Sequence, residues 1–166
     1  RGARNTMATT KLGDASQEAA AQSFWGRASA YDQWLESLGL PVHKGYFIED
    51  MRTLEVAPWE EFECNAAFIQ LAGMEGISEA RITEIPPGAT LPPTRFALDE
   101  AVYVIEGSGI TTVWTEGSPK HSFEWGPRSL FLMPQGATRQ YSNARGDRPA
   151  RLVHTNHLPL AMSLVP

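Results

Sequence analysis

Glu100, Arg139, Tyr141 and His154 carry side chains that could perform acid–base chemistry on a small molecule. Each lies in a short segment, set off by glycine or proline, that is predicted to be a strand. An arginine binds a carboxylate or enolate oxygen through its planar guanidinium, and a carboxylate or an imidazole moves protons. Proton transfer combined with stabilisation of an anion is sufficient for isomerisation, dehydration or cyclisation without a metal.

The sequence lacks the motifs of several other chemistries. Cys64 is the single cysteine, which excludes an intrachain disulfide and a thiolate metal cluster, and we expect it to be a small buried apolar residue. Gly107-Ser108-Gly109 links two predicted strands and opens no helix, so it indicates a hairpin rather than a phosphate-binding loop. No serine lies in a nucleophile elbow, and no cysteines or histidines have zinc-site spacing.

Composition narrows the class of protein. The 166 residues carry a net charge of −5, which argues against nucleic acid or an anionic membrane as partner. A hydrophobic fraction of 42% and a charged fraction of 20% are ordinary for a globular domain. No apolar run approaches the roughly 18 residues of a membrane span, and the first residues lack the apolar centre of a secretory signal. We therefore predict a cytoplasmic protein.

The amino-terminal part is predicted to be disordered over residues 1–15 and helical over residues 16–38. Ser29 followed three residues later by Asp32 indicates a capping box, and Gly39 indicates the helix end. We assign residues 16–61 to a helical arm with leading strands. The helical stretch is predicted in two pieces, the first from about Ser16 to Trp25 and the second from Ser29 onward. The apolar face of the second piece needs a partner, either the β-domain or a second subunit.

Beyond residue 42 the hydrophobic pattern changes to a period of two. The predicted strands are Gly45–Ile48, Thr53–Val56, Ala66–Ala72, Glu79–Ile85, Glu100–Glu106, Gly109–Thr115, His121–Trp125, Ser129–Met133, Thr138–Asn143 and Arg151–Asn156. Many short strands separated by glycine or proline, without helices between them, predict an all-β antiparallel sandwich or barrel.

Two stretches of the chain resemble the two motifs of the cupin superfamily. The first has matching spacing at Gly88, Thr94, Phe96, Glu100 and Gly107. The second has it at Pro134, Gly136, Arg139 and Asn143. The resemblance implies a jelly-roll barrel (a double-stranded β-helix) over residues 62–160, followed by a tail at 161–166. The run EWGPRSLFLMP also resembles the amino-terminal half of two-domain cupins (bicupins) related to aromatic-ring dioxygenases.

The same resemblance implies that the usual metal site has changed. Cupin metal sites use three histidines and a carboxylate, and histidines usually stand where this chain has Thr94, Phe96 and Arg139. Glu100 is retained, but threonine is a poor ligand, phenylalanine is none, and a guanidinium repels a cation. We therefore predict a barrel that holds no metal in the usual place and needs no cofactor.

The cupin frame implies that Glu100 and Arg139 face each other inside the barrel, which leaves two interpretations open. One is a buried salt bridge in place of the ion. The other is a charged pair below an apolar pocket, where Arg139 holds an oxyanion and Glu100 moves a proton if a partly dry pocket raises its pKa towards neutral. His154 and Tyr141 would assist. Alternatively, His154 is simply packed or hydrogen-bonded at a strand end.

Four further residues are predicted to bind substrate, namely Thr94, Phe96, Trp114 and Met133. The predicted function is that of a metal-independent isomerase, dehydratase or cyclase (a lyase-type or cyclising activity) on a small carbonyl-bearing or polyketide-like metabolite in secondary metabolism. Two alternatives remain: a non-catalytic binding or interaction module, and a metal-dependent dioxygenase with ligands from other positions.

A homodimer is predicted from the cupin resemblance, because cupins commonly pair through barrel faces and amino-terminal segments. The amphipathic stretch Tyr31–Leu38 and the apolar run Tyr46-Phe47-Ile48 are the features that could form the contact.

Overall fold

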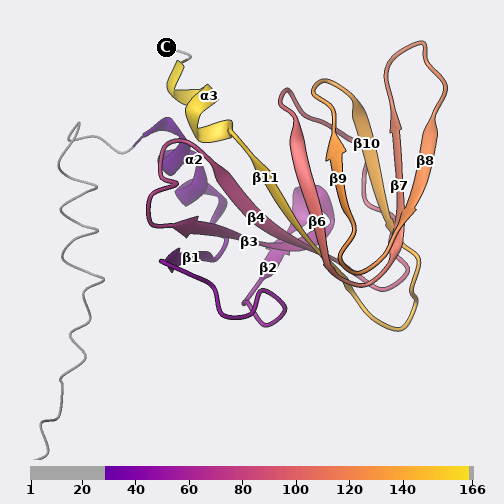
Figure 1. Ribbon diagram of the computed structural model, residues 1–166, viewed down its shortest axis with the longest axis horizontal. Helices are drawn as coiled ribbons and strands as arrows, with labels where there is room; N and C mark the ends of the chain where they lie inside the picture. The colour runs from indigo at the N-terminus through magenta and orange to yellow at the C-terminus, as the bar shows by residue number, and fades with distance from the viewer. Residues whose placement is uncertain (1–28, 165–166) are drawn as a thin grey trace, which may run out of the picture.

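The computed structural model describes residues 29–164, which form two β-sheets with short helices at one end (Figure 1). The strands are β1 (Val42–Gly45), β2 (Ala57–Trp59), β3 (Cys64–Leu71), β4 (Glu79–Ile85), β5 (Thr94–Arg95), β6 (Glu100–Glu106), β7 (Gly109–Trp114), β8 (His121–Trp125), β9 (Leu130–Met133), β10 (Thr138–Asn143) and β11 (Ala150–Asn156). The helices are α2 (Ala30–Leu38), the single 3₁₀ turn η1 (Glu60–Phe62) and α3 (Leu158–Leu164). The predicted disordered start and first helical piece lie outside the described residues.

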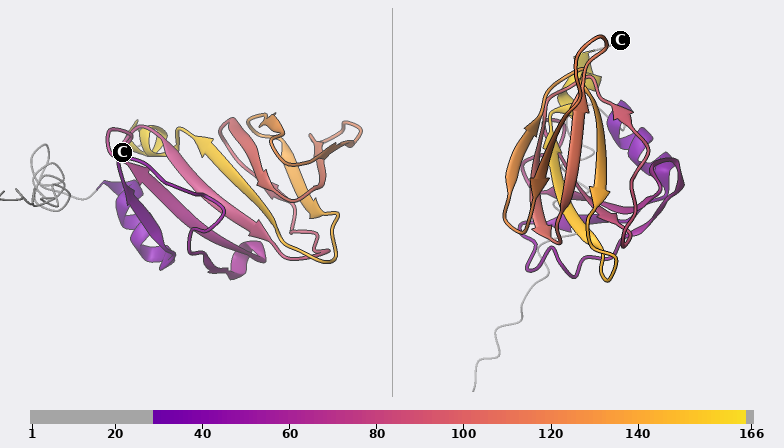
Figure 2. Two further views of the ribbon diagram at one scale, coloured as in Figure 1. Left: turned by 60° about the horizontal axis from the view of Figure 1, so that its bottom comes forward. Right: turned by 90° about the vertical axis from the view of Figure 1, so that its right-hand side faces the viewer.

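The strands divide into a seven-stranded and a four-stranded sheet. The larger sheet has the order β1-β3-β4-β11-β6-β9, with β2 also pairing with β3, and the smaller has the order β5-β10-β7-β8. Neighbouring strands are antiparallel except β1 and β3, which run parallel. The two layers are visible from the side in Figure 2. The predicted all-β, two-sheet architecture is confirmed, with one parallel pair added.

Side chains from both sheets fill one end of the sandwich. The buried members of this core include Ile85, Val102, Val104, Trp125, Met133 and Leu152. The packing depends on a glycine, because a Cβ at Gly109 would lie 2.4 Å from the Trp125 ring and 2.1 Å from the Ser142 carbonyl oxygen. The Trp125 ring nitrogen donates to the Thr111 hydroxyl at 2.9 Å, which satisfies its polar atom inside the core.

Helix α2 begins and ends as the sequence predicts. The Ser29 hydroxyl accepts from the Asp32 backbone N–H at 3.1 Å, and the Asp32 carboxylate accepts from the Ser29 N–H at 3.2 Å. Gly39 adopts a left-handed conformation, with φ of 65°, and its N–H donates to the Glu36 carbonyl. Such a reciprocal capping box satisfies two N–H groups that a helix start leaves without partners.

The apolar face of α2 packs within the same chain. Tyr31 and Leu35 are buried against Phe68 of β3, and Leu158 and Met162 of α3 join the same cluster. The partner of this face is therefore the β-domain, together with a second helix that the sequence did not predict. Asn156 accepts from the Leu158 N–H through its side-chain oxygen at 2.8 Å, which marks the start of α3. None of the helices in residues 29–164 is long and apolar enough to cross a membrane.

Two predicted strands are wrong. A strand was predicted at Gly45–Ile48, but strand β1 already ends at Gly45. Tyr46 and Phe47, which follow it, are 72% and 75% exposed. The strand predicted at Thr53–Val56 is a loop, because the carbonyl of Leu54 accepts from the Arg151 guanidinium at 3.0 Å instead of joining a ladder.

A short strand follows this loop and contains Pro58. Strand β2 pairs with β3 and no other strand of the described sheet, so the missing N–H of proline is tolerated there.

Candidate functional site

A cavity of about 240 Å³ lies between the two sheets at the end where α2 and α3 pack. Its walls are mostly apolar, formed by Trp34, Leu38, Trp59, Phe62, Cys64, Leu91, Pro92, Phe96 and Leu158. Its polar lining consists of Glu61, Arg81, Thr83, Thr94, Arg95, Glu100, Arg139, Tyr141 and His154. Glu61 and Arg95 are exposed, so they mark the side on which the cavity meets solvent.

Strand alternation explains how the polar side chains reach the cavity. Residues two apart on a strand share a face, so Arg139 and Tyr141 point inward together from β10. On β11, Leu152 and His154 share the inward face, with Leu152 in the apolar core and His154 at the cavity. The same strands thus contribute apolar residues to one end of the sandwich and polar residues to the other.

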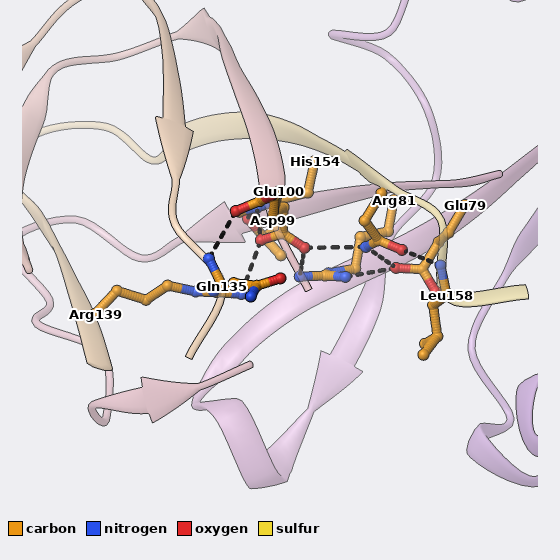
Figure 3. A network of polar contacts seen from close by, with 10 residues as sticks. Glu79, Arg81, Asp99, Glu100, Gln135, Arg139, His154 and Leu158 are labelled. Carbon is orange, nitrogen blue, oxygen red and sulfur yellow. Dashed lines mark hydrogen bonds and ion pairs between the residues drawn. The ribbon is translucent and has the colours of Figure 1, made fainter. Parts of the chain in front are cut away.

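Glu100 is the centre of the buried polar network, and none of its surface is exposed. Its Oε2 accepts from Arg81 Nη2 at 2.7 Å and from Asn156 Nδ2 at 3.1 Å. Its Oε1 accepts from Arg139 Nη2 at 3.0 Å and lies 3.0 Å from His154 Nδ1. Figure 3 shows these contacts converging on the carboxylate from both sides. The predicted meeting of Glu100 and Arg139 is therefore present in the structure.

The network continues along β4. Arg81 also forms an ion pair with Glu79, and Asn156 donates to Glu79 Oε1 at 3.1 Å. The result is a chain Arg139–Glu100–Arg81–Glu79, in which two guanidiniums alternate with two carboxylates. Buried ions are stable when they are paired and hydrogen-bonded, and this arrangement balances charge without a metal.

The pKa of Glu100 is held well below its usual range. Burial alone would raise it, but the cations Arg81 and Arg139 and the hydrogen bond with His154 outweigh burial. The interpretation in which Glu100 moves a proton depended on the expectation that a partly dry pocket raises this pKa towards neutral. The structure corrects that expectation, because the carboxylate has two guanidiniums within hydrogen-bonding distance and stays ionised.

His154 is placed between Glu100 and Thr83. An ionised carboxylate only accepts, so Nδ1 carries the proton, and in the neutral ring Nε2 accepts from the Thr83 hydroxyl at 2.7 Å. Burial lowers the pKa of His154; Glu100 opposes this shift, whereas Arg81 and Arg139 add to it. The ring is therefore a neutral base, with its free electron pair directed at a hydroxyl on the cavity wall.

Two hydrogen-bond donors at the cavity have no partner among the described residues. The Arg139 Nη1 group and the Tyr141 hydroxyl are both buried and unpaired, and both residues line the cavity. Burial raises the pKa of Tyr141, so its hydroxyl keeps its proton. The Arg139 guanidinium also lies 5.3 Å from the centre of the Phe96 ring. Unsatisfied buried donors are rare in proteins, so a pair at one cavity indicates a site for an acceptor oxygen.

The predicted substrate-binding residues separate into two groups. Thr94 and Phe96 line the cavity. Met133 instead packs in the apolar core, where it pairs with Glu100 across β6 and β9. Trp114 lies along a different groove, with the Lys120 ammonium 4.2 Å from the centre of its ring. The prediction that Met133 and Trp114 line the same pocket as Thr94 and Phe96 is therefore corrected.

Several site residues were not identified from the sequence. Arg81, Glu79, Thr83 and Asn156 complete the network, and charged or polar residues on a strand are normally solvated, so the pattern gave no signal for them. Cys64 also lines the cavity, and burial raises the pKa of its thiol to about 11, which keeps it neutral.

The donor set does not fit a divalent metal ion. In residues 29–164, no group of three or more His, Cys, Asp or Glu side chains could hold one. Both oxygens of Glu100 already accept two hydrogen bonds each, and the Arg139 guanidinium occupies the neighbouring position with a fixed positive charge.

Comparison with known proteins identifies the fold. No protein-family model and no curated protein matches the chain. Among solved structures, the cupin domain of Schizosaccharomyces pombe Cnp3 is similar with a TM-score of 0.52 and 16% identity, covering 65% of this chain and 71% of that one. Drosophila melanogaster CENP-C, solved bound to CAL1, is similar with a TM-score of 0.54 and 12% identity, covering 86% and 99%.

An enzyme is also among the similar structures. Oxalate decarboxylase of Lactobacillus farciminis, solved as a formate complex, gives a TM-score of 0.55 and 17% identity, covering 68% of this chain and 35% of the enzyme. The chain thus spans about a third of that protein. These similarities show that the chain has the cupin fold, and that proteins sharing the fold include enzymes and non-enzymes.

Proposed function

We propose that this cupin binds a small organic molecule in the cavity and acts on it by proton transfer with stabilisation of an anionic oxygen. The observation that carries the proposal is a pair of donors at one mostly apolar cavity, Arg139 Nη1 and the Tyr141 hydroxyl, which have no partner within residues 29–164. A pocket lined by apolar residues with a few convergent polar groups is the usual form of a small-molecule site.

The residues then have distinct roles. Arg139 and Tyr141 hold the oxygen on which negative charge develops. His154 takes the proton, directly or through the Thr83 hydroxyl that its Nε2 contacts at 2.7 Å. Glu100 remains ionised and stabilises the imidazolium through Nδ1. This assigns the proton to His154 and changes the sequence-based role of Glu100 from carrier to electrostatic support. Isomerisation, dehydration and cyclisation all remain within this scheme.

The test separates binding from catalysis without a known substrate. A panel of small cyclic ketones, acids and phenols is screened against the protein by two-dimensional amide NMR, and bound compounds are then followed in D₂O for deuterium incorporation. We expect shifts at β6, β10 and β11, with deuterium incorporation that His154→Asn abolishes. Binding without incorporation in the wild type would favour a non-catalytic binding module. A panel in which nothing shifts the cavity residues would contradict the proposal.

Metal content distinguishes the remaining alternative. Elemental analysis of the purified protein is expected to give no stoichiometric transition metal. A stoichiometric iron or manganese ion would instead favour a dioxygenase with ligands outside the usual positions. A cytoplasmic location and the absence of a nucleic-acid partner are part of the same proposal.

We also infer that two copies associate. Leu130 and Leu132, on the edge strand β9, are 71% and 58% exposed, and an exposed apolar edge is a ready site for pairing. Tyr46 and Phe47 add a second exposed apolar pair. Sedimentation at micromolar concentration is expected to show a dimer, and a compact monomer would contradict the inference.

A further inference from the structure

The charges around the cavity are balanced before any ligand binds. In the described part of the chain, three cations line the cavity: Arg81, Arg95 and Arg139. Two carboxylates, Glu61 and Glu100, also line it, and Glu79 pairs with Arg81 from behind.

The three positive charges are thus matched by three negative charges, and His154 is neutral. At the buried end of the cavity, opposite charges are in direct contact. Arg139 Nη2 lies 3.0 Å from Glu100 Oε1, so the charge of Arg139 is already compensated, although its Nη1 lacks a partner in the part of the chain that the structure describes.

An oxygen bound here therefore meets two unused hydrogen-bond donors but no unbalanced charge. An ionised carboxylate would bring a net negative charge into a buried, neutral cluster, and an uncompensated buried charge is strongly unfavourable. An uncharged carbonyl oxygen uses the same two donors without that penalty, because a carbonyl accepts two hydrogen bonds through its lone pairs.

The size and lining of the cavity restrict the rest of the ligand. A cavity of about 150 Å³ in another protein holds benzene. The 240 Å³ here accommodates one ring with short substituents. Trp34, Trp59 and Phe96 contribute aromatic walls, which favour an apolar ring.

We infer that the natural ligand is an uncharged, single-ring ketone or related carbonyl compound, bound by its carbonyl oxygen between Arg139 Nη1 and the Tyr141 hydroxyl. This inference rests on the proposed function and specifies its substrate class. It also fits the chemistry: removing a proton next to the carbonyl moves the electron pair onto the oxygen as an enolate, and the proton goes to His154 Nε2. The two donors then meet more charge in the transition state than in the bound ketone, which is the condition for catalysis.

Three matched probes test the inference by amide NMR titration of the full chain: acetophenone, benzoate and ethylbenzene. They share a ring and differ in carrying a neutral acceptor, an anionic acceptor or none. Acetophenone is expected to bind at least tenfold more tightly than benzoate, and more tightly than ethylbenzene. Benzoate binding as tightly as acetophenone, or more tightly, would overturn the inference while the proposed cavity function stands. Failure of all three probes to shift the cavity residues would overturn both.

Tyr141→Phe provides the residue-level test. The variant removes an unpartnered hydroxyl without a void, so it should fold, and its acetophenone affinity should fall roughly three- to tenfold. Ethylbenzene affinity should not change. The matched control is Tyr103→Phe, because Tyr103 alternates with the inward Val102 and Val104 of β6 and is not part of the cavity lining. An equal loss of acetophenone affinity in both variants, or no loss in Tyr141→Phe, would overturn the inference.

Discussion

The two ends of the sandwich are built from the same strands, but apolar side chains fill one end, whereas the other holds a buried ionic network beside a mostly apolar cavity. On β6, Val102 and Val104 pack in the apolar core, whereas Glu100 anchors the ionic network. On β11, Leu152 belongs to the first end and His154 to the second. The end that holds the apolar core, here called the filled end, is stabilised by burial of apolar surface. The end that holds the cavity, here called the hollow end, is stabilised by paired charges. On β6 and β11, residues two positions apart thus serve the apolar core and the polar network, although Cys64, Leu91 and Tyr141 belong to both the core cluster and the cavity lining.

The largest expected effect comes from breaking the network at its centre. Glu100→Leu leaves Arg81 with one partner and Arg139 with none in a buried site, so the free energy of unfolding should fall by about 3–5 kcal/mol. Urea denaturation measures it. The double variant Glu100→Leu/Arg139→Met removes both charges of the second pair and should lose less than the single variant. A double variant that is less stable than Glu100→Leu would show that the pair does not act as a unit.

A substitution in the apolar core provides the matching test of stability at the filled end. Leu152→Ala removes a fully buried side chain and should lower the free energy of unfolding by about 2–5 kcal/mol, through lost burial and a new void. Because Leu152 lies two residues from His154 but in the other compartment, acetophenone binding to the folded variant should not change. A loss of affinity comparable to that in Tyr141→Phe would mean that the two ends are not separable.

The pH dependence of stability should come from the hollow end. The pKa values of His154 and Glu100 are lowered on folding, so below their ordinary values of 6.5 and 4.5 the unfolded chain binds more protons than the folded one. Stability therefore decreases as pH falls, first below about 6.5 and again below about 4.5, with a slope of up to about 1.4 kcal/mol per pH unit for each group. His154→Asn should remove the first step in denaturation curves measured from pH 8 to pH 4. A first step that persists in this variant would contradict its assignment.

The sequence was informative where local chemistry decides the structure. Ser29 and Asp32 predict the start of α2, and the glycines and prolines of the two motifs predict the jelly roll. Arg139 and Tyr141 are two residues apart on one strand, a spacing that puts both on the same face, and the cupin spacing implied that Glu100 lies opposite Arg139. These features depend on residues within a few positions of each other or on a fixed motif.

What the sequence did not predict depends on contacts between distant segments. Arg81 has the pattern of a solvated strand residue, and its burial follows from Glu79 on its own strand and Glu100 on another. The walls that Trp34 and Leu158 give the cavity exist because α2 and α3 pack together at one end. The role expected for Glu100 failed for the same reason, since a second cation that the sequence did not reveal keeps its pKa low.

The Arg139–Glu100 pair has a consequence for motion as well as for charge. Arg139 belongs to the four-stranded sheet and Glu100 to the seven-stranded one, and among the described residues this is the ion pair that crosses between the sheets. Any breathing that parts the layers at the hollow end must separate two buried charges before water arrives to solvate them. The ion pair thus joins the two sheets at the emptier end in addition to packing, and the proposed ligand would exchange on the side of Glu61 and Arg95, where the cavity meets solvent.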